Sequence, residues 1–179
     1  TYSDKCNSVD DKTAAQRFAG ALEKKMREEN TAQHFMAEAL DLAREAAEAG
    51  EVPVGAVIVR DGKMIGRAGN RTEAQKDPTA HAEMLAIRQA LEAVGGWRLT
   101  GCDMYVTLEP CAMCAGAIVH ARIRNLYIGT EDPKTGACGS VLDITGDTRL
   151  NHQPHVERGI LREECSDLLK CFFRQLRRK

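Results

Sequence analysis

An imidazole and two thiols that must come together in space constrain the fold of this chain more than any other feature of its sequence. His81 lies in Pro78–Glu83, which reads PTAHAE, and Cys111 and Cys114 lie in Glu109–Cys114, which reads EPCAMC. Nitrogen and sulfur ligands of this kind suit one zinc ion, although other soft divalent ions accept the same set. Three protein ligands leave a tetrahedral zinc with one open position, which normally holds water. The fold must therefore bring residue 81 to residues 111 and 114.

Hydrophobic periodicity divides the chain into alternating helices and strands. Helical spacing of apolar residues predicts helices, β-branched runs predict strands, and the pair Asp61-Gly62 predicts a hairpin turn. In chain order, the expected elements are a helix through 35–46 that stops at residue 50, strands at 54–59 and 64–68, a helix from about 81 that stops at 95–96, a strand at 104–108, a helix at 112–121, a strand at 125–129, a short strand at 155–157 and a helix at 162–176. This alternation predicts an α/β protein with a sheet covered by helices.

Two of the predicted helices begin at the three candidate ligands. His81 lies near the start of one helix, and Cys111 and Cys114 lie at the start of another, so both helix N-termini point at one spot. Their positive dipole ends would help to keep thiolates deprotonated and would favour a metal-bound hydroxide. Glu83, two residues beyond His81, would reach the metal-bound water without being a ligand. A carboxylate in that place suits a general base.

Each half of this pattern has a simpler interpretation when it is taken alone. A single Cys-x-x-Cys pair is often structural or redox-active, and a single histidine in a helix is usually a packing or surface residue. A structural zinc normally takes a fourth protein ligand. The nearest candidates for it have no paired spacing: Cys102, Cys138, His120 and His152. The combination therefore favours a catalytic metal site with an open position.

Length and composition set the outer limits of the fold. The 179 residues can bury one core, and we expect one domain at 32–179 preceded by an extension at 1–31. For that extension, a tag, a linker or a frayed segment is favoured over a short amphipathic helix through Phe18, Leu22 and Met26. Without an apolar run long enough to cross a bilayer, or a recognisable leader, a soluble cytoplasmic protein is expected. Five cysteines are predicted to be free thiols, as in a reducing compartment: Cys6, Cys102, Cys138, Cys165 and Cys171.

Charge is nearly balanced over the whole chain, with a formal net charge of −1, but the C-terminus is basic. Arg174, Arg177, Arg178 and Lys179 could contact phosphates. A solvated helix end explains the same cluster equally well, because cations suit the negative pole of the helix dipole. Charge alone does not identify a partner.

The motif His-Ala-Glu followed by Pro-Cys-x-x-Cys resembles the signature of the zinc-dependent nucleoside and base deaminases. The similarity to the bacterial tRNA adenosine deaminases runs from about residue 32 to the C-terminus. It includes Asn70 and the segments Glu51–Ala56, Asp77–Glu83, Tyr105–Cys111, Met113–Ala117, Lys134–Ala137, Leu150–His152, Gly159–Leu161 and Phe172–Arg174. The resemblance implies a cytidine-deaminase-like fold, a three-layer α/β/α sandwich around a mixed five-stranded sheet. It also implies one zinc ion per subunit and a homodimer.

The activity implied by the resemblance is hydrolytic deamination of adenosine to inosine at the wobble position of a tRNA anticodon. Zinc held by His81, Cys111 and Cys114 lowers the pKa of its bound water from about 15.7 towards about 7. The resulting hydroxide would attack C6 of the adenine. Glu83 would then carry the water proton to the ring nitrogen and later to the departing amine, which requires a raised pKa.

The same resemblance implies roles for residues around the base. Asn70 would hydrogen-bond the flipped purine, Val54 and Leu108 would form walls of the pocket, and the backbone amide of Ala82 would meet the base edge. Simpler roles stand beside these. Val54 and Leu108 equally suit the core of a strand, and Asn70 follows a strand end, where asparagine also forms turns.

Further positions would contact the nucleotides around the target. Asp132 would lie beside the flanking nucleotides, and Phe172, Phe173 and Arg174 would combine base stacking with phosphate contact. The alternative role for Asp132 is turn formation before a proline, and at least one of the two phenylalanines is expected to pack in the core.

Two other functions remain open at this point. The same fold and mechanism could act on a free base or nucleotide, such as cytosine, guanine or deoxycytidylate. A non-catalytic zinc module that binds RNA or a protein is a different class, and it would have no use for an unliganded carboxylate at Glu83.

Overall fold

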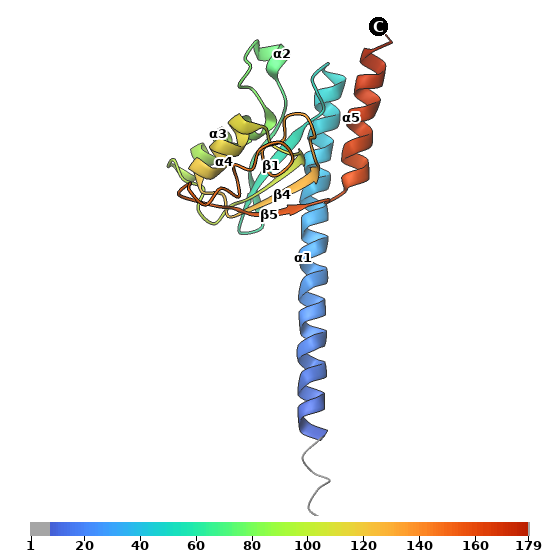
Figure 1. Ribbon diagram of the computed structural model, residues 1–179, viewed down its shortest axis with the longest axis vertical. Helices are drawn as coiled ribbons and strands as arrows, with labels where there is room; N and C mark the ends of the chain where they lie inside the picture. The colour runs from blue at the N-terminus through green and yellow to red at the C-terminus, as the bar shows by residue number, and fades with distance from the viewer. Residues whose placement is uncertain (1–7, 179) are drawn as a thin grey trace, which may run out of the picture.

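A mixed five-stranded sheet forms the centre of the structure, a computed structural model that describes residues 8–178 (Figure 1). The strand order is β2-β1-β3-β4-β5. Strand β1 is antiparallel to both β2 and β3, whereas β4 is parallel to both β3 and β5. The strands are β1 (Gly55–Arg60), β2 (Lys63–Gly69), β3 (Asp103–Leu108), β4 (Asn125–Thr130) and β5 (His155–Arg158). The predicted mixed five-stranded sheet is confirmed.

Helices cover both faces of the sheet, which gives the predicted three layers. One face carries α3 (Ala82–Val94) and α4 (Ala112–Ala121), and the other carries α1 (Ser8–Glu48) and α5 (Arg162–Leu176). Figure 1 shows the two pairs on opposite sides of the strands. Buried residues form one apolar cluster on each side; that on the α3 and α4 side includes Ile58, Met104 and Ile118, and that on the α1 side includes Met36 and Tyr105.

Local sequence explains the hairpin at the edge of the sheet. Strands β1 and β2 are joined by Asp61 and Gly62, which both have positive φ angles, 50° and 75°. An Asp-Gly pair adopts such angles readily, and the twist of this turn matches that of the paired strands. The turn therefore sets the register that buries Ala56 and Ile58 beneath α3.

Helix α1 differs from the expectation for the N-terminal part of the chain. A linker or frayed extension was favoured before residue 32, but residues 8–31 form the first turns of the same helix that packs on the sheet. Residues 13–31 are exposed, and burial begins at Ala32. Two exposed ion pairs along this part, Lys24–Glu28 and Lys25–Glu29, have helical i,i+4 spacing. The helix continues because no proline interrupts residues 8–48.

The remaining helix, α2 (Thr72–Gln75), was not expected from the sequence. It has four residues and buries none of them, so it leaves no hydrophobic periodicity to detect. Two of the positions noted in the sequence, Cys6 and Lys179, lie outside the described residues. None of the helices within residues 8–178 is both long enough and apolar enough to span a membrane.

Candidate active site

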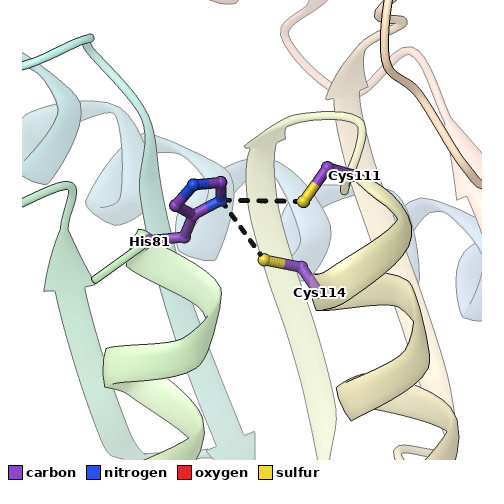
Figure 2. A group of neighbouring side chains, drawn as sticks. All are labelled: His81, Cys111 and Cys114. Atoms are coloured by element: carbon purple, nitrogen blue, oxygen red, sulfur yellow. Dashed lines mark hydrogen bonds between the residues drawn. The ribbon is translucent and has the colours of Figure 1, made fainter. Parts of the chain in front are cut away.

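Three side chains from the starts of two helices converge on one point. His81 is the N-cap residue of α3, Cys111 is the N-cap residue of α4, and Cys114 lies in the first turn of α4. Nδ1 of His81 is 3.7 Å from Sγ of Cys111 and 3.5 Å from Sγ of Cys114. Figure 2 shows the imidazole facing both sulfur atoms across the gap between the two helices. The structure thus brings together the three residues that the sequence predicted would meet.

The spacing of these atoms matches a metal site. Zinc–nitrogen bonds of about 2.05 Å and zinc–sulfur bonds of about 2.3 Å at tetrahedral angles place nitrogen and sulfur about 3.6 Å apart. The two observed distances, 3.5 and 3.7 Å, bracket that value. Within residues 8–178, these three side chains are the one group of histidine, cysteine or carboxylate ligands close enough to hold a metal ion, with all ligand atoms within 4.8 Å of one another. The donor set fits a soft divalent ion with one position left open.

The alternative fourth ligands lie elsewhere in the structure. Nε2 of His152 is 2.6 Å from the backbone oxygen of Ile123, and Cys102 and Cys138 are buried in the core without joining the ligand group. His120 lies in the last turn of α4, at the opposite end of that helix from Cys111. Among the residues that the structure describes, the arrangement is therefore that of three protein ligands rather than four.

The pKa values of the two thiols are shifted in opposite directions. Hydrogen bonds from Cys114 and His81 lower the pKa of Cys111 to about 4. The hydrogen bond to Cys111 and burial raise the pKa of Cys114, and the contact with Cys111 raises the pKa of His81. A bound divalent cation deprotonates the thiols that coordinate it. Metal binding at this group would therefore release a proton from Cys114.

Glu83 lies beside the ligand group but is not a member of it. Its side chain is in the first turn of α3 and the residue is only 4% exposed, yet it lines the same cavity as His81 and Cys111. Burial raises the pKa of Glu83 to about 7. A carboxyl group near half-protonation at neutral pH can both accept and donate a proton, as general acid–base catalysis requires.

A cavity of about 740 Å³ opens over this group and collects most of the predicted substrate-binding residues. Six of them line it: Val54, Asn70, Leu108, Asp132, Phe173 and Arg174. Ala82 and Phe172 do not line it; Ala82 is fully buried, and Phe172 is partly buried with its ring against Phe173. The structure therefore brings the first six together at the cavity, whereas Ala82 and Phe172 do not border it.

Asn70 and Ala82 are joined directly. Oδ1 of Asn70 accepts a hydrogen bond from the backbone N–H of Ala82 at 2.8 Å. The sequence placed this amide at the base edge, but here its single hydrogen is donated to Asn70. The contact fixes the end of β2 to the start of α3, where His81 and Glu83 lie.

The sequence predicted only part of the face of α5 that borders the cavity: Phe173, Arg174 and Arg177 were expected near RNA, whereas Ser166, Leu169 and Lys170 were not. Ser166, Leu169 and Lys170 line the cavity together with Phe173, Arg174 and Arg177. These positions follow helical spacing, so they share a face of α5. That periodicity was available in the sequence, but nothing in it showed that this face borders the metal ligands.

The loop after β4 forms another part of the cavity wall. Oδ1 of Asp132 accepts hydrogen bonds from the backbone N–H groups of Lys134 and Thr135, and Oδ2 accepts one from the Thr135 hydroxyl. Burial raises the pKa of Asp132, but these hydrogen bonds outweigh it and hold the pKa below its usual value. Asp132 thus forms the turn foreseen for it while also lining the cavity.

Comparisons with known proteins agree with this site. The family model of MafB19-like deaminases matches residues 30–177. The tRNA-specific adenosine deaminase of Bacillus subtilis strain 168 is 49% identical over 145 residues, which cover 81% of this chain and 90% of that protein. The protein of the same name from Agrobacterium fabrum strain C58 is 52% identical over 144 residues, covering 80% of this chain and 95% of that protein.

Solved structures show the same fold. One, from work on A-to-I editing by tRNA deaminases at the wobble position of transfer RNA, superposes with a TM-score of 0.74 at 52% identity and covers 76% of this chain and 99% of that chain. A guanine deaminase from Nitrosomonas europaea, at 23% identity, superposes with a TM-score of 0.70 over 78% of this chain and 83% of its own. This second likeness concerns the fold alone. By its sequence and its fold, the chain belongs to the MafB19-like deaminase family, among the tRNA-specific adenosine deaminases.

Proposed function

We propose that this protein hydrolyses adenosine to inosine at the wobble position of a tRNA anticodon. One observation carries the proposal: the buried carboxyl group of Glu83 lies beside the His81, Cys111 and Cys114 group, in a chain about half identical to tRNA-specific adenosine deaminases. A metal module that only binds RNA has no need for a buried carboxyl group next to the ligands. The reaction consumes water and releases ammonia.

His81, Cys111 and Cys114 would hold one zinc ion in each subunit. When bound, zinc supplies Lewis-acid chemistry that lowers the pKa of a water molecule from about 15.7 to about 7. The protein supplies the ligand geometry, with nitrogen–sulfur distances of 3.5 and 3.7 Å, and the positive ends of two helices at the same spot. Both features favour the ionised form of the attacking water.

Glu83 would move the protons in this reaction. It accepts the proton of the water that attacks C6 of adenine and delivers it to the ring nitrogen N1. After C6 has become tetrahedral, the same carboxyl group would carry the proton of the hydroxyl now on C6 to the exocyclic amine. The bond between C6 and that amine then breaks, ammonia leaves, and C6 becomes the carbonyl of inosine. Each step needs a group that both takes up and releases protons near neutral pH, and the pKa of Glu83, raised to about 7 by burial, meets that need.

The remaining wall of the cavity would bind the target nucleotide and its neighbours. Val54, just before β1, and Leu108, at the end of β3, would enclose the base. Asn70 is hydrogen-bonded both to the backbone oxygen of Val54 and to the N–H of Ala82 at the start of α3. A cavity of about 740 Å³ exceeds the volume of one nucleoside, which leaves room for flanking residues of the RNA. We assign contacts with those flanking residues to Asp132, Phe173 and Arg174, since aromatic and basic side chains together suit single-stranded RNA.

The wider organisation is part of the same proposal. Residues 32–179 form the catalytic domain and residues 1–31 an extension, a division supported by the onset of burial at Ala32. Exposed apolar side chains at Val141 and Leu142 support a homodimer, because such neighbours on a surface often mark an interface. A cytoplasmic location fits the tRNA substrate, and it fits the six free cysteines within residues 8–178.

Inosine formation on a set of substrates tests the activity. The substrates are an anticodon stem-loop RNA with adenine at the wobble position, the same RNA with that adenine moved one position along the loop, and free adenosine, cytidine, guanine and deoxycytidylate. We expect turnover only of the first RNA. Turnover only of a free base or nucleotide would replace the tRNA substrate by a small molecule, and no turnover by protein shown to contain zinc would restore the binding-module alternative.

A further inference from the structure

A second buried carboxylate, Glu51, lies close to the site but outside its cavity. The residue is 2% exposed and sits between the C-terminus of α1 and the start of β1. Oε1 of Glu51 accepts a hydrogen bond from the backbone N–H of Ala74 at 2.8 Å. Oε2 accepts one from the N–H of Glu73 at 3.1 Å and one from the hydroxyl of Thr72 at 3.2 Å. Glu51 therefore binds the first residues of α2.

Residues 51–54 hold the segment 70–74 at two places. The Glu51 carboxylate is the first, and the second is the backbone oxygen of Val54, which accepts a hydrogen bond from the N–H of Asn70 at 3.1 Å. The side chain of Asn70 then accepts the hydrogen bond from Ala82. A continuous set of hydrogen bonds thus leads from Glu51, through the segment 70–74, to the start of α3.

The rest of the segment is held by hydrogen bonds rather than by apolar packing, including one from the N–H of Arg71 to the backbone oxygen of Ala80 at 3.0 Å. Helix α2 buries no residue, so no apolar contact anchors it, and Figure 1 shows it standing beyond the end of the sheet. The segment also lies between two cavities. Asn70 and Thr72 line the catalytic cavity, while Asn70, Arg71 and Ala74 line a second cavity of about 470 Å³ on the other side. Because α2 buries no side chain, the segment takes its position chiefly from its hydrogen bonds.

Burying a carboxylate without a cation bonded to it is costly, and here N–H and O–H groups satisfy it instead. Ordinary helix capping would be served by an uncharged serine, threonine or asparagine. A charged acceptor makes stronger hydrogen bonds than these neutral groups do. The charge at Glu51 is therefore suited to holding in place a segment that has no apolar anchor.

We infer that Glu51 is a positioning residue for deamination: its carboxylate fixes residues 70–74 and thereby the placement of Asn70 against the metal ligands and Glu83. The inference rests on the proposed function for its catalytic consequence. The structural part of the inference is that the Glu51 charge keeps residues 70–74 ordered, and this can be tested without any substrate.

The main test substitutes glutamine at this position. In Glu51→Gln, one oxygen becomes an amide nitrogen that faces the N–H of Ala74 or of Glu73, so at least one hydrogen bond is lost. Since a misplacement of about 1 Å in an active site costs about 100-fold in rate, we expect kcat on the stem-loop RNA to fall 10- to 100-fold. We expect KM to change less than threefold, because phosphate contacts dominate RNA binding. Metal content should equal that of the unmodified protein.

A matched control separates positioning from loss of stability. Val59→Ala removes core volume at the far end of β1 from residue 51, on the α1 side of the sheet. At a temperature where both variants are folded, Val59→Ala should keep kcat within twofold. Equal losses of kcat in the two variants would overturn the inference. Glu51→Asp, which keeps the charge on a shorter side chain, should recover part of the rate.

Amide hydrogen exchange gives a readout that does not depend on activity. Exchange at Glu73, Ala74 and Ala82 should accelerate at least tenfold in Glu51→Gln and stay unchanged in Val59→Ala. If Glu51→Gln does not fold, Thr72→Ala removes one of the three hydrogen bonds and should give a smaller change of the same kind. Unchanged exchange at these amides would overturn the inference, even if the wobble-adenine RNA is a substrate. Accelerated exchange in a protein that lacks this activity would instead contradict only the proposed function.

Discussion

The side-chain oxygen of Asn70 accepts a hydrogen bond from the backbone N–H of Ala82, and this contact joins the end of β2 to the first turn of α3. Ala82 lies between His81, a candidate metal ligand, and Glu83, the candidate proton carrier. The N–H of Ala82 is one of the amides at a helix N-terminus that have no partner within the helix. Asn70 supplies that partner and also lines the cavity, so one side chain serves both the fold and the site.

Asn70→Ala should therefore affect both stability and activity. The substitution leaves the buried N–H of Ala82 without an acceptor, which costs about 1–3 kcal/mol in the free energy of unfolding. Asn70→Asp keeps an acceptor oxygen and should lose less stability. Denaturant unfolding of the two variants checks this order, and equal stability of Asn70→Ala and the unmodified protein would show that water satisfies the amide. In activity assays, Asn70→Ala should lower kcat/KM on the wobble-adenine RNA at least tenfold.

Glu83→Gln should separate proton transfer from metal binding. Glutamine has nearly the same shape as glutamate but cannot carry a proton, so kcat should fall by about 10² to 10⁴, the usual contribution of a general acid–base group. Glu83 is outside the ligand group, so the zinc content should stay at one equivalent per chain. Single-turnover rates and metal analysis on the same preparation provide the measurement. Activity within tenfold of the unmodified protein would contradict the role given to Glu83.

Much of the fold could be predicted because its elements are strongly periodic and clearly ended. The bounds expected for α4 and α5, 112–121 and 162–176, agree with the structure, and the strands differ by one or two residues. Proline before α4 and the Asp-Gly turn between β1 and β2 mark boundaries that local chemistry decides. The metal ligands could be predicted for a related reason, since residue type and spacing alone indicate the chemistry.

What the sequence could not supply depends on tertiary contacts. Burial distinguishes Glu51 from the many exposed glutamates, and no local pattern reveals it. That carboxylate accepts hydrogen bonds from the first N–H groups of α2, a tertiary contact between residues more than 20 positions apart that local propensity does not reveal. The length of α1 was underestimated because a helix through Phe18, Leu22 and Met26 was the less favoured interpretation of a mostly polar segment. These side chains are exposed, so this part of the helix forms without burying its apolar positions.

Two glycine substitutions should have opposite effects on stability. A methyl group at Gly55 would overlap the backbone oxygen of Ala39, where β1 packs against α1. Gly55→Ala should therefore destabilise the protein by about 1–3 kcal/mol or more, as overpacking does. Gly116 lies inside α4 with open space around it, so Gly116→Ala should stabilise by about 0.5–1 kcal/mol. Thermal unfolding of both variants checks the contrast, which would be refuted if Gly55→Ala were as stable as Gly116→Ala.

The charge on Glu51 should make a contribution to the free energy of unfolding that depends on pH. Burial raises the pKa of Glu51, but the hydrogen bonds from Ala74, Glu73 and Thr72 outweigh it and hold the pKa below the usual value of 4.5. A lowered pKa stabilises the folded protein above pH 4.5, and this contribution disappears as the pH falls through the lowered value. The difference in the free energy of unfolding between the unmodified protein and Glu51→Gln should therefore be constant near neutral pH and shrink below about pH 4.5. Chemical denaturation from pH 3.5 to 7 measures this difference. A difference that grows towards acid pH would contradict a lowered pKa of Glu51 in the folded protein.

The paired phenylalanines of α5 should differ in their effects although they are neighbours in sequence. The two rings meet edge to face at 5.4 Å, but only Phe173 lines the cavity, while Phe172 is partly buried on another side of the helix. A stacking contact with an RNA base contributes about 1–3 kcal/mol, so Phe173→Ala should weaken binding of the stem-loop RNA about tenfold and alter the unfolding midpoint little. Phe172→Ala should do the reverse, lowering stability with less than a threefold change in RNA affinity. Binding titrations and thermal unfolding on the two variants distinguish the roles. Equal losses of affinity would mean that α5 turns to present both rings to the RNA.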